Sequence, residues 1–279
     1  MSRYRKKLRF SRIVLHLVLL CTSLFMVSPF IWMFLTSFKP DVEIVTETPK
    51  FLPDTWVVEH YAKLPQKAPF FRFFLNGILV SSVSTVFVLF GSAAAGYIFA
   101  KYKFRSLSFF FFLIIATILI PIQTYMIPLY LFLNWMGWIN TYQGMIFPLI
   151  IMSSGIFFLR QHIRGSIPND FIDAARIDGA TEFHIFRTII LPLSISPLAA
   201  ISIVNWIYTW SLFIWYLIVA NSEDMFTMEV GLMYFQRAFS VDYGGIMAAC
   251  MATIVPVLVV FLLFRTQIIE GVSFTGVKY

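Results

Sequence analysis

Charged residues are scarce in this chain: Asp, Glu, Lys and Arg make up only 13% of its 279 residues, whereas 59% are hydrophobic and 18% aromatic. Soluble domains carry about 25% charged residues and about 45–50% apolar ones. With a mean hydropathy of +0.81, the chain has too little polar surface to cover itself in water. The composition therefore argues against a soluble enzyme and against a nucleic-acid-binding domain. The two cysteines, Cys21 and Cys250, lie in apolar runs and build no disulfide framework or metal cluster.

The sequence also lacks the short motifs of common catalytic sites. It contains no Gly-rich phosphate loop of the G-x-x-x-x-G-K-[ST] type, no His-Glu-x-x-His and no Gly-x-Ser-x-Gly. Apart from His16, its long apolar runs hold no ionisable residue of the kind that ion-coupled carriers keep in the membrane. We expect neither enzyme activity nor a metal site in this chain, and any energy for uphill transport would come from another subunit.

Long stretches without Asp, Glu, Lys or Arg indicate membrane spans. A bilayer core about 30 Å thick requires roughly 20 apolar residues in a helix. The uncharged stretches cover 13–38, 73–100, 106–159, 188–222 and 243–264. The third of them has 54 residues, enough for two spans, while the others hold one each. We expect an all-α integral membrane protein with six transmembrane helices at about 13–38, 73–100, 108–132, 142–160, 190–219 and 243–265.

The basic residues predict the orientation of these spans. If the N-terminus is inside, inner segments carry 15 Lys and Arg residues and outer segments carry six, so the positive-inside rule places both termini in the cytoplasm. The net charge of +7 then reflects topology and not nucleic-acid binding. We expect one transmembrane domain over 1–279, with outer loops at 39–72 and 220–242, an inner loop at 161–189 and a C-terminal tail at 266–279.

Small residues stand four apart in the second expected span. They form the run Gly91-Ser92-Ala93-Ala94-Ala95-Gly96. Such spacing lets another helix approach closely, and that helix could belong to the same chain or to another subunit.

The inner loop is patterned like a helix. Pro168 followed by Asn and Asp indicates a helix start, and Gly179 indicates a stop, so we expect about three turns of helix within 168–180. Its apolar face should be formed by Phe171, Ala174 and Ala175. A helix this short is marginal alone in water. Its apolar face should therefore be buried, either by the ends of the chain's own spans or by a cytoplasmic partner.

Two groups of polar and aromatic residues are candidates for contact with a solute. In the third expected span, Pro121 and Pro128 should kink the helix around residues suited to hydroxyl-rich solutes, Gln123 and Tyr125. The fifth expected span holds Asn205, Trp206, Trp210 and Ser211. Aromatic rings can stack on sugars, yet Trp and Tyr also serve as interfacial anchors. Both interpretations remain open.

One run of residues resembles a known family signature. Asp173-Ala174-Ala175, three residues, Gly179, nine residues and Ile189-Ile190-Leu191-Pro192 resemble the Glu-Ala-Ala-x3-Gly-x9-Ile-x-Leu-Pro loop of binding-protein-dependent ABC importer permeases, with Asp for Glu. Shorter fragments resemble the carbohydrate-type branch, and within it the second permease of maltose-type importers: Thr36-Ser37-Phe38-Lys39, Asn76, Pro128-Leu129-Tyr130 and Ile167-Pro168.

This resemblance implies a permease subunit of an ATP-driven sugar importer in a prokaryotic plasma (inner) membrane. Its partners would be a second permease, a dimeric ATPase that binds ATP and magnesium, and an external solute-binding protein that delivers carbohydrate. The residues implied in ATPase coupling are Phe171, Asp173, Ala174, Ala175, Ile177 and Gly179. Alternatives are a permease for a polyol, a glycerol phosphate derivative or a peptide, and a secondary carrier that works alone. In members of this family the C-terminal tail reaches the ATPase. At position 279 this chain has Tyr, where the family commonly has Gly.

Overall fold

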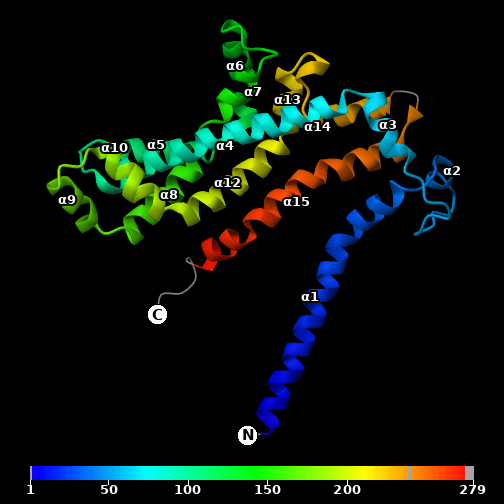
Figure 1. Ribbon diagram of the computed structural model, residues 1–279, viewed down its shortest axis with the longest axis horizontal. Coiled ribbons are helices and arrows are strands. Elements are labelled where there is room, and N and C mark those ends of the chain that lie inside the picture. Colours follow the sequence, from blue (N-terminus) through cyan, green and yellow to red (C-terminus); the bar gives the residue numbers. More distant parts are fainter. Residues whose placement is uncertain (1, 238–239, 274–279) are drawn as a thin grey trace. The chain divides into compact units, whose positions relative to one another are not determined.

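The protein is predominantly helical, as expected. The computed structural model describes residues 2–237 and 240–273 (Figure 1). In this part of the chain the strands are β1 (Gln236–Arg237) and β2 (Ser240–Val241), an antiparallel pair in which Gln236 faces Val241. This small hairpin is the one departure from the all-α expectation.

The chain divides into two compact units. The first comprises Met1–Ala68 and Leu232–Ile254, and the second comprises Pro69–Gly231 and Val255–Tyr279. The first unit contains α1 (Ser2–Thr36), α2 (Asp41–Ile44), α3 (Glu59–Lys67), the 3-10 helix η4 (Leu232–Phe235), the hairpin and the beginning of α15 (Tyr243–Ser273).

The second unit is built on α4 (Phe70–Lys101), which is followed by α5 (Leu107–Thr117), α6 (Ile122–Trp135), α7 (Tyr142–Ile146), η1 (Phe147–Leu149) and α8 (Ser153–Ser166). Next come α9 (Asn169–Ile177), α10 (Glu182–Ile185), the π-helix η2 (Phe186–Ile190), α11 (Leu191–Leu193) and α12 (Ile195–Trp210). The unit continues with α13 (Phe213–Val219), η3 (Glu223–Met225) and α14 (Met228–Gly231).

Three uninterrupted helices are long and apolar enough to cross a membrane. They cover Arg12–Thr36, Phe70–Lys101 and Tyr243–Phe264, close to the first, second and sixth expected spans. The expected tail, 266–279, begins as a continuation of α15 to Ser273, and residues 274–279 lie outside the described part.

The other three expected spans are broken. The axes bend by 100° between α5 and α6, by 43° between Tyr142–Leu149 and α8, and by 77° between Glu182–Leu193 and α12. The described residues therefore hold three candidate spans, or up to six if each bent pair is one span. The break expected in the third span lies before Pro121, which precedes α6 in an extended conformation, whereas Pro128 lies within that helix.

The helices α8 and α12 both pack against α4 (Figure 1). At the α8 crossing, a Cβ added to Gly96 would lie 2.8 Å from the Cβ of Leu159, and one added to Gly155 would lie 2.6 Å from the Ser92 Oγ. A Cβ added to Gly91 would meet nothing within 4 Å. The small-residue run therefore packs within the chain through Ser92 and Gly96, whereas Gly91 is exposed.

Two hydrophobic clusters form along α4. Val80 belongs to one of them, and Val88 belongs to the other. The first cluster includes Leu133, Met145, Trp215, Tyr216 and Val219. The second includes Leu159, Ile163, Ile172, Ile185 and Ile190. The second cluster buries one residue of α9, so the expected loop helix rests on the core of its own chain.

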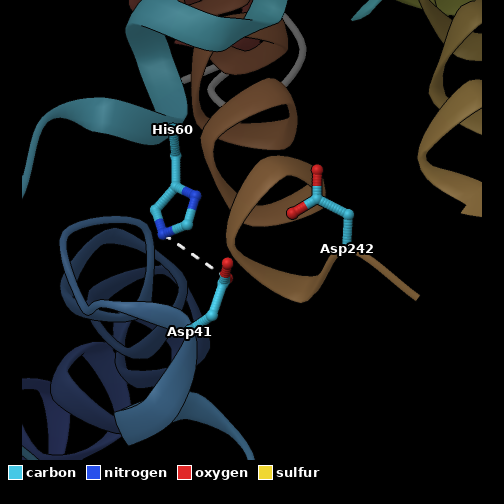
Figure 2. A group of neighbouring side chains, drawn as sticks. All are labelled: Asp41, His60 and Asp242. Carbon is cyan, nitrogen blue, oxygen red and sulfur yellow. Dashed lines mark ion pairs between the residues drawn. The ribbon is translucent and has the colours of Figure 1, made fainter. Parts of the chain in front are cut away.

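In the first unit, α3 packs on the start of α15 through His60. This side chain is buried between Asp41 and Asp242 (Figure 2). Its Nε2 lies 2.8 Å from the Lys39 carbonyl oxygen and 3.9 Å from Asp41 Oδ1. Gly244 leaves room for the imidazole, because a Cβ there would lie 2.2 Å from the ring.

The same three residues have the chemistry of metal ligands, with candidate ligand atoms within 4.8 Å of one another. Several of these atoms already have protein partners. Asp242 Oδ1 accepts a hydrogen bond from the Gly245 amide at 2.9 Å, and its other oxygen pairs with Lys67. These contacts tie α3 to the start of α15 without a metal ion, and the expected lack of a metal site stays a prediction.

The crossing of α4 and α8 can be tested with matched glycine variants. We expect Gly96→Leu to lower the thermal unfolding midpoint of the detergent-purified protein, because overpacking costs about 1–3 kcal/mol. Gly91→Leu places the same side chain on the open face of the same helix and should leave the midpoint nearly unchanged. Equal shifts in the two variants would contradict this packing.

The Lys67–Asp242 ion pair can be tested with Asp242→Asn. Asparagine can still accept the Gly245 hydrogen bond at the helix start, but it removes the charge. We expect amide hydrogen exchange in α3 to accelerate roughly two- to fivefold at pH 7, the range for ion pairs of this kind.

The pH dependence of that difference follows from the Asp242 carboxyl. Burial raises its pKa, but hydrogen bonds from Lys67 and the Gly245 amide lower it below its ordinary value. Because the folded-state pKa is lowered, the stabilisation is complete above the ordinary carboxyl pKa of about 4 and is lost only as pH falls through the lower value. The ratio of exchange rates should thus be the same at pH 7 and pH 5, after correction for intrinsic exchange. A marked decline at pH 5 would rule out this assignment.

Candidate functional site

The expected loop helix is α9, and its ends lie where the sequence indicates. Pro168 precedes its first residue in an extended conformation. Gly179 has a φ of +81°, in the left-handed region that favours glycine. The Gly179 amide donates to the Arg176 carbonyl at 3.0 Å, and the Ala180 amide donates to the Ala175 carbonyl at 2.9 Å. These two bonds make a Schellman motif, which terminates the helix.

The two alanines of α9 lie on different faces, so the expectation that Phe171, Ala174 and Ala175 share one face is wrong. Ile172 is buried, and Ala175 packs beside it against the second cluster. Phe171 is 54% exposed and Ile177 is 87% exposed. Ala175 is partly buried like its inward neighbour Ile172, whereas Ala174 is exposed like Phe171. We call Phe171, Ala174 and Ile177 the outward face of α9.

Glu182 ties α9 to α4. One of its carboxylate oxygens accepts a hydrogen bond from Arg176 Nε at 2.8 Å, and the other accepts one from the Tyr97 hydroxyl at 2.7 Å. The Arg176 guanidinium also lies over the Tyr102 ring, 5.7 Å from its centroid. Asp173 pairs with Arg176 at 3.4 Å, but both side chains are well exposed and such pairs contribute little.

A second tie lies at the start of α9. The Lys101 ammonium, at the end of α4, donates to the Ile167 carbonyl and to Asn169 Oδ1, the latter at 2.8 Å. Sequence reasoning found neither tie. Glu182 follows Arg176 by six positions with a turn between them, so no helical spacing links the two, and Tyr97 is far away in sequence.

The solute-contact candidates fall into two groups. Asn205, Trp206 and Trp210 are buried. Asn205 donates to Thr85 Oγ1 at 3.0 Å, Trp206 donates to Ser82 Oγ at 3.2 Å, and the two indoles stack with centroids 5.2 Å apart. These contacts hold α12 on α4. The exposed candidates are Gln123, Tyr125 and Ser211.

Comparison with known proteins identifies the class of this protein. Residues 88–270 match the family described as "Binding-protein-dependent transport system inner membrane component". The chain is 35% identical to the arabinooligosaccharides transport system permease protein AraQ of Halalkalibacterium halodurans, over 90% of this chain and 91% of that protein. It is 30% identical to the diacetylchitobiose uptake system permease protein NgcG of Streptomyces coelicolor, over 92% and 86%.

This chain therefore belongs to the family of binding-protein-dependent transport system inner membrane components, as the signature in the loop indicates. It is a permease subunit and not an enzyme. Its fold matches that of a chain in a bacterial ABC transporter involved in the import of the acidic polysaccharide alginate, with a TM-score of 0.79, 22% identity and coverage of 92% of this chain and 96% of that one.

The end of α9 offers a test of the loop geometry. We expect Gly179→Ala to speed hydrogen exchange in the last turn of α9 roughly fivefold, because a side chain in the left-handed region costs about 1 kcal/mol or more. Gly165→Ala is the control. Neither glycine has an atom within 4 Å of an added Cβ, but Gly165 lies in the last turn of α8, where alanine is tolerated. Equal responses would contradict a backbone role for Gly179.

Proposed function

We propose that this chain is one of two permease subunits that together form the translocation path of an ATP-driven sugar importer. On this proposal it has six spans, each bent pair crosses once, and both termini lie on the cytoplasmic side of the plasma membrane. An external solute-binding protein delivers the sugar to the outer surface, including the loop 220–242. ATP and magnesium bind in a dimeric ATPase partner, and this chain supplies the part that the ATPase moves.

The two-sided construction of α9 is the observation that carries this proposal. Its outward face presents the apolar side chains of Phe171 and Ile177 on either side of Ala174. An alanine at the centre lets a partner surface approach closely, and the apolar neighbours gain by being covered. On the opposite face, Ile172 is buried in the chain's own core, so the helix is attached to the spans that it would have to move.

The ties of α9 to α4 support its role as a coupling element. A push on the outward face would reach α4 through Glu182 and through Lys101, which both hold α9 by hydrogen bonds. Gly179 fixes where the helix ends, and Asp173 places a carboxylate beside the outward face. The proposed coupling residues therefore remain Phe171, Asp173, Ala174, Ala175, Ile177 and Gly179, with Ala175 acting from the inner side of the helix.

The proposed substrate is a sugar. Relatives that match 90% and 92% of this chain are permeases for arabinooligosaccharides and for diacetylchitobiose, which supports a carbohydrate. Gln123, Tyr125 and Ser211 are exposed and can offer hydrogen bonds to hydroxyl groups. We propose that these three line the solute path, while Asn205, Trp206 and Trp210 support it from behind.

A glycerol phosphate derivative is the second candidate substrate. The sn-glycerol-3-phosphate transport system permease protein UgpE of Brucella abortus is 27% identical to this chain, over 94% of the chain and 95% of that protein. Uptake by the complete importer with its cognate binding protein distinguishes the two substrates. Stimulation of the ATPase by oligosaccharides and not by glycerol phosphate would favour the sugar, and the reverse result would replace it.

The docking of α9 is tested by Ala174→Asp in the importer purified with its partner subunits. A carboxylate on the outward face would be buried without a partner, which costs several kcal/mol, so we expect substrate-stimulated ATP hydrolysis to fall at least about tenfold. The control is Ser166→Asp, which adds the same charge at an exposed position at the end of α8 and should leave stimulation nearly intact. Full stimulation in Ala174→Asp would refute the docking role.

A further inference from the structure

A cavity lined by basic residues lies beside the ties of α9, within the second unit. It has a volume of about 680 Å³ and lies between the end of α4, the start of α5 and the end of α8. Five cationic side chains and the amide of Asn169 line it. The cations are Lys101, Lys103, Arg105, Arg160 and Arg164.

No carboxylate lines the cavity: the residues around it include neither Asp nor Glu. Among the side chains that the structure describes, the ion pairs within 4 Å involve other lysines and arginines. The positive-inside rule explains why basic residues lie at this end of the helices, but it does not make them converge on one cavity. Five like charges around a shared space favour binding of an anion.

Arg160 and Lys101 are fixed in place with donors to spare. Arg160 Nε donates to the Phe99 carbonyl at 3.1 Å, and its guanidinium lies over the Phe111 ring, 4.0 Å from the centroid. A guanidinium has five N–H donors, and among the described residues one further bond, to Gln161 at 3.3 Å, uses them. The Lys101 ammonium uses two of its three N–H donors in hydrogen bonds to the Ile167 carbonyl and to Asn169 Oδ1. Both groups can therefore donate to a ligand without moving.

The walls of the cavity favour a lipid over a soluble anion. Phe99, Phe104, Leu107 and Phe111 line it beside the cations. On α5, Phe109, Phe110 and Phe112 are each at least half exposed, as expected of side chains that face lipid. A phospholipid whose phosphate lies among the cations would place its acyl chains against this apolar surface. Basic pockets between helix ends bind anionic lipid headgroups in this way.

We propose that this cavity is a binding site for the phosphate headgroup of an anionic phospholipid. Lys103, Arg105 and Arg164 attract the headgroup, and Arg160 and Lys101 donate hydrogen bonds to its phosphate oxygens. The assignment to the inner leaflet rests on the proposed function, because it requires the orientation given there. Occupation of the site neutralises the charge next to Lys101, the residue that holds the start of α9.

The test is a lipid titration of the complete importer, delipidated in detergent and followed by native mass spectrometry. The probe is phosphatidylglycerol, with phosphatidylcholine of the same acyl chains as the neutral comparison. We expect phosphatidylglycerol to bind saturably and phosphatidylcholine not to do so. Arg105→Gln and Arg164→Gln should each weaken it about fivefold, the effect of one basic residue near an anionic surface. Neither side chain makes a hydrogen bond or ion pair to the described residues that would be lost.

The matched control is Arg187→Gln. It removes one positive charge from an exposed residue of η2 that does not line the cavity, and it should leave phosphatidylglycerol binding unchanged. If all three variants bind phosphatidylglycerol as the unmodified protein does, the proposal is wrong. If inorganic phosphate at millimolar concentration displaces the lipid completely, the site is one for a free anion and the lipid assignment fails.

A cross-linking experiment tests whether a partner protein covers the cavity. In Lys103→Cys, efficient disulfide cross-linking to a cysteine placed on the ATPase would show that the partner fills the site, which would also overturn the proposal. Lipid binding in detergent requires neither transport nor ATP, so this result is independent of the Ala174→Asp test. Loss of one with retention of the other separates failure of the lipid site from failure of the coupling proposal.

Discussion

The second unit depends on how closely other helices can approach α4. Glycine and serine allow that approach: Gly96 and Ser92 meet α8, and a Cβ added to Gly77 would lie 2.9 Å from the Trp210 ring on α12. In close contact of this kind, dispersion accumulates over many atom pairs and little space is left unfilled. Both hydrophobic clusters contain residues of α4. Larger residues at these positions would hold α8 and α12 away from α4, and the side chains of the two clusters could not pack together.

The position of α9 follows from that arrangement. A nine-residue helix has little stability of its own in water, so its placement comes from Ile172 in the core and from Glu182, which joins Arg176 to Tyr97. The helix is thereby attached on one side and free on the other. If the outward face docks a partner as proposed, it is already held in place before the partner binds, which reduces the ordering that binding would require.

The sequence predicts the helical membrane fold because a soluble domain rarely holds several uncharged apolar stretches of this length, and it predicts the ends of α9 because Pro168 and Gly179 act on the local backbone. It does not predict the tie from Glu182 to Tyr97, since a contact between distant segments leaves no spacing pattern. Ala174 and Ala175 face different ways because the core takes up Ile172 and not Phe171. The sequence alone does not show which of these two large side chains is buried. Asn205, Trp206 and Trp210 show a further limit: side chains suited to a sugar are equally suited to packing two helices together.

The sharp turn between α5 and α6 has a consequence for the isolated subunit. The two helices have 11 and 14 residues, or roughly 16 and 21 Å at 1.5 Å per residue, so neither reaches across a hydrocarbon layer of about 30 Å. Between them Leu119 is 84% exposed, in a segment of irregular backbone. Bare hydrocarbon does not tolerate non-helical backbone, which must be shielded by protein or hydrated. If this turn lies at membrane depth, as the proposed function has it, a copy surrounded by lipid alone would expose it, and water or a neighbouring protein surface must lie beside it.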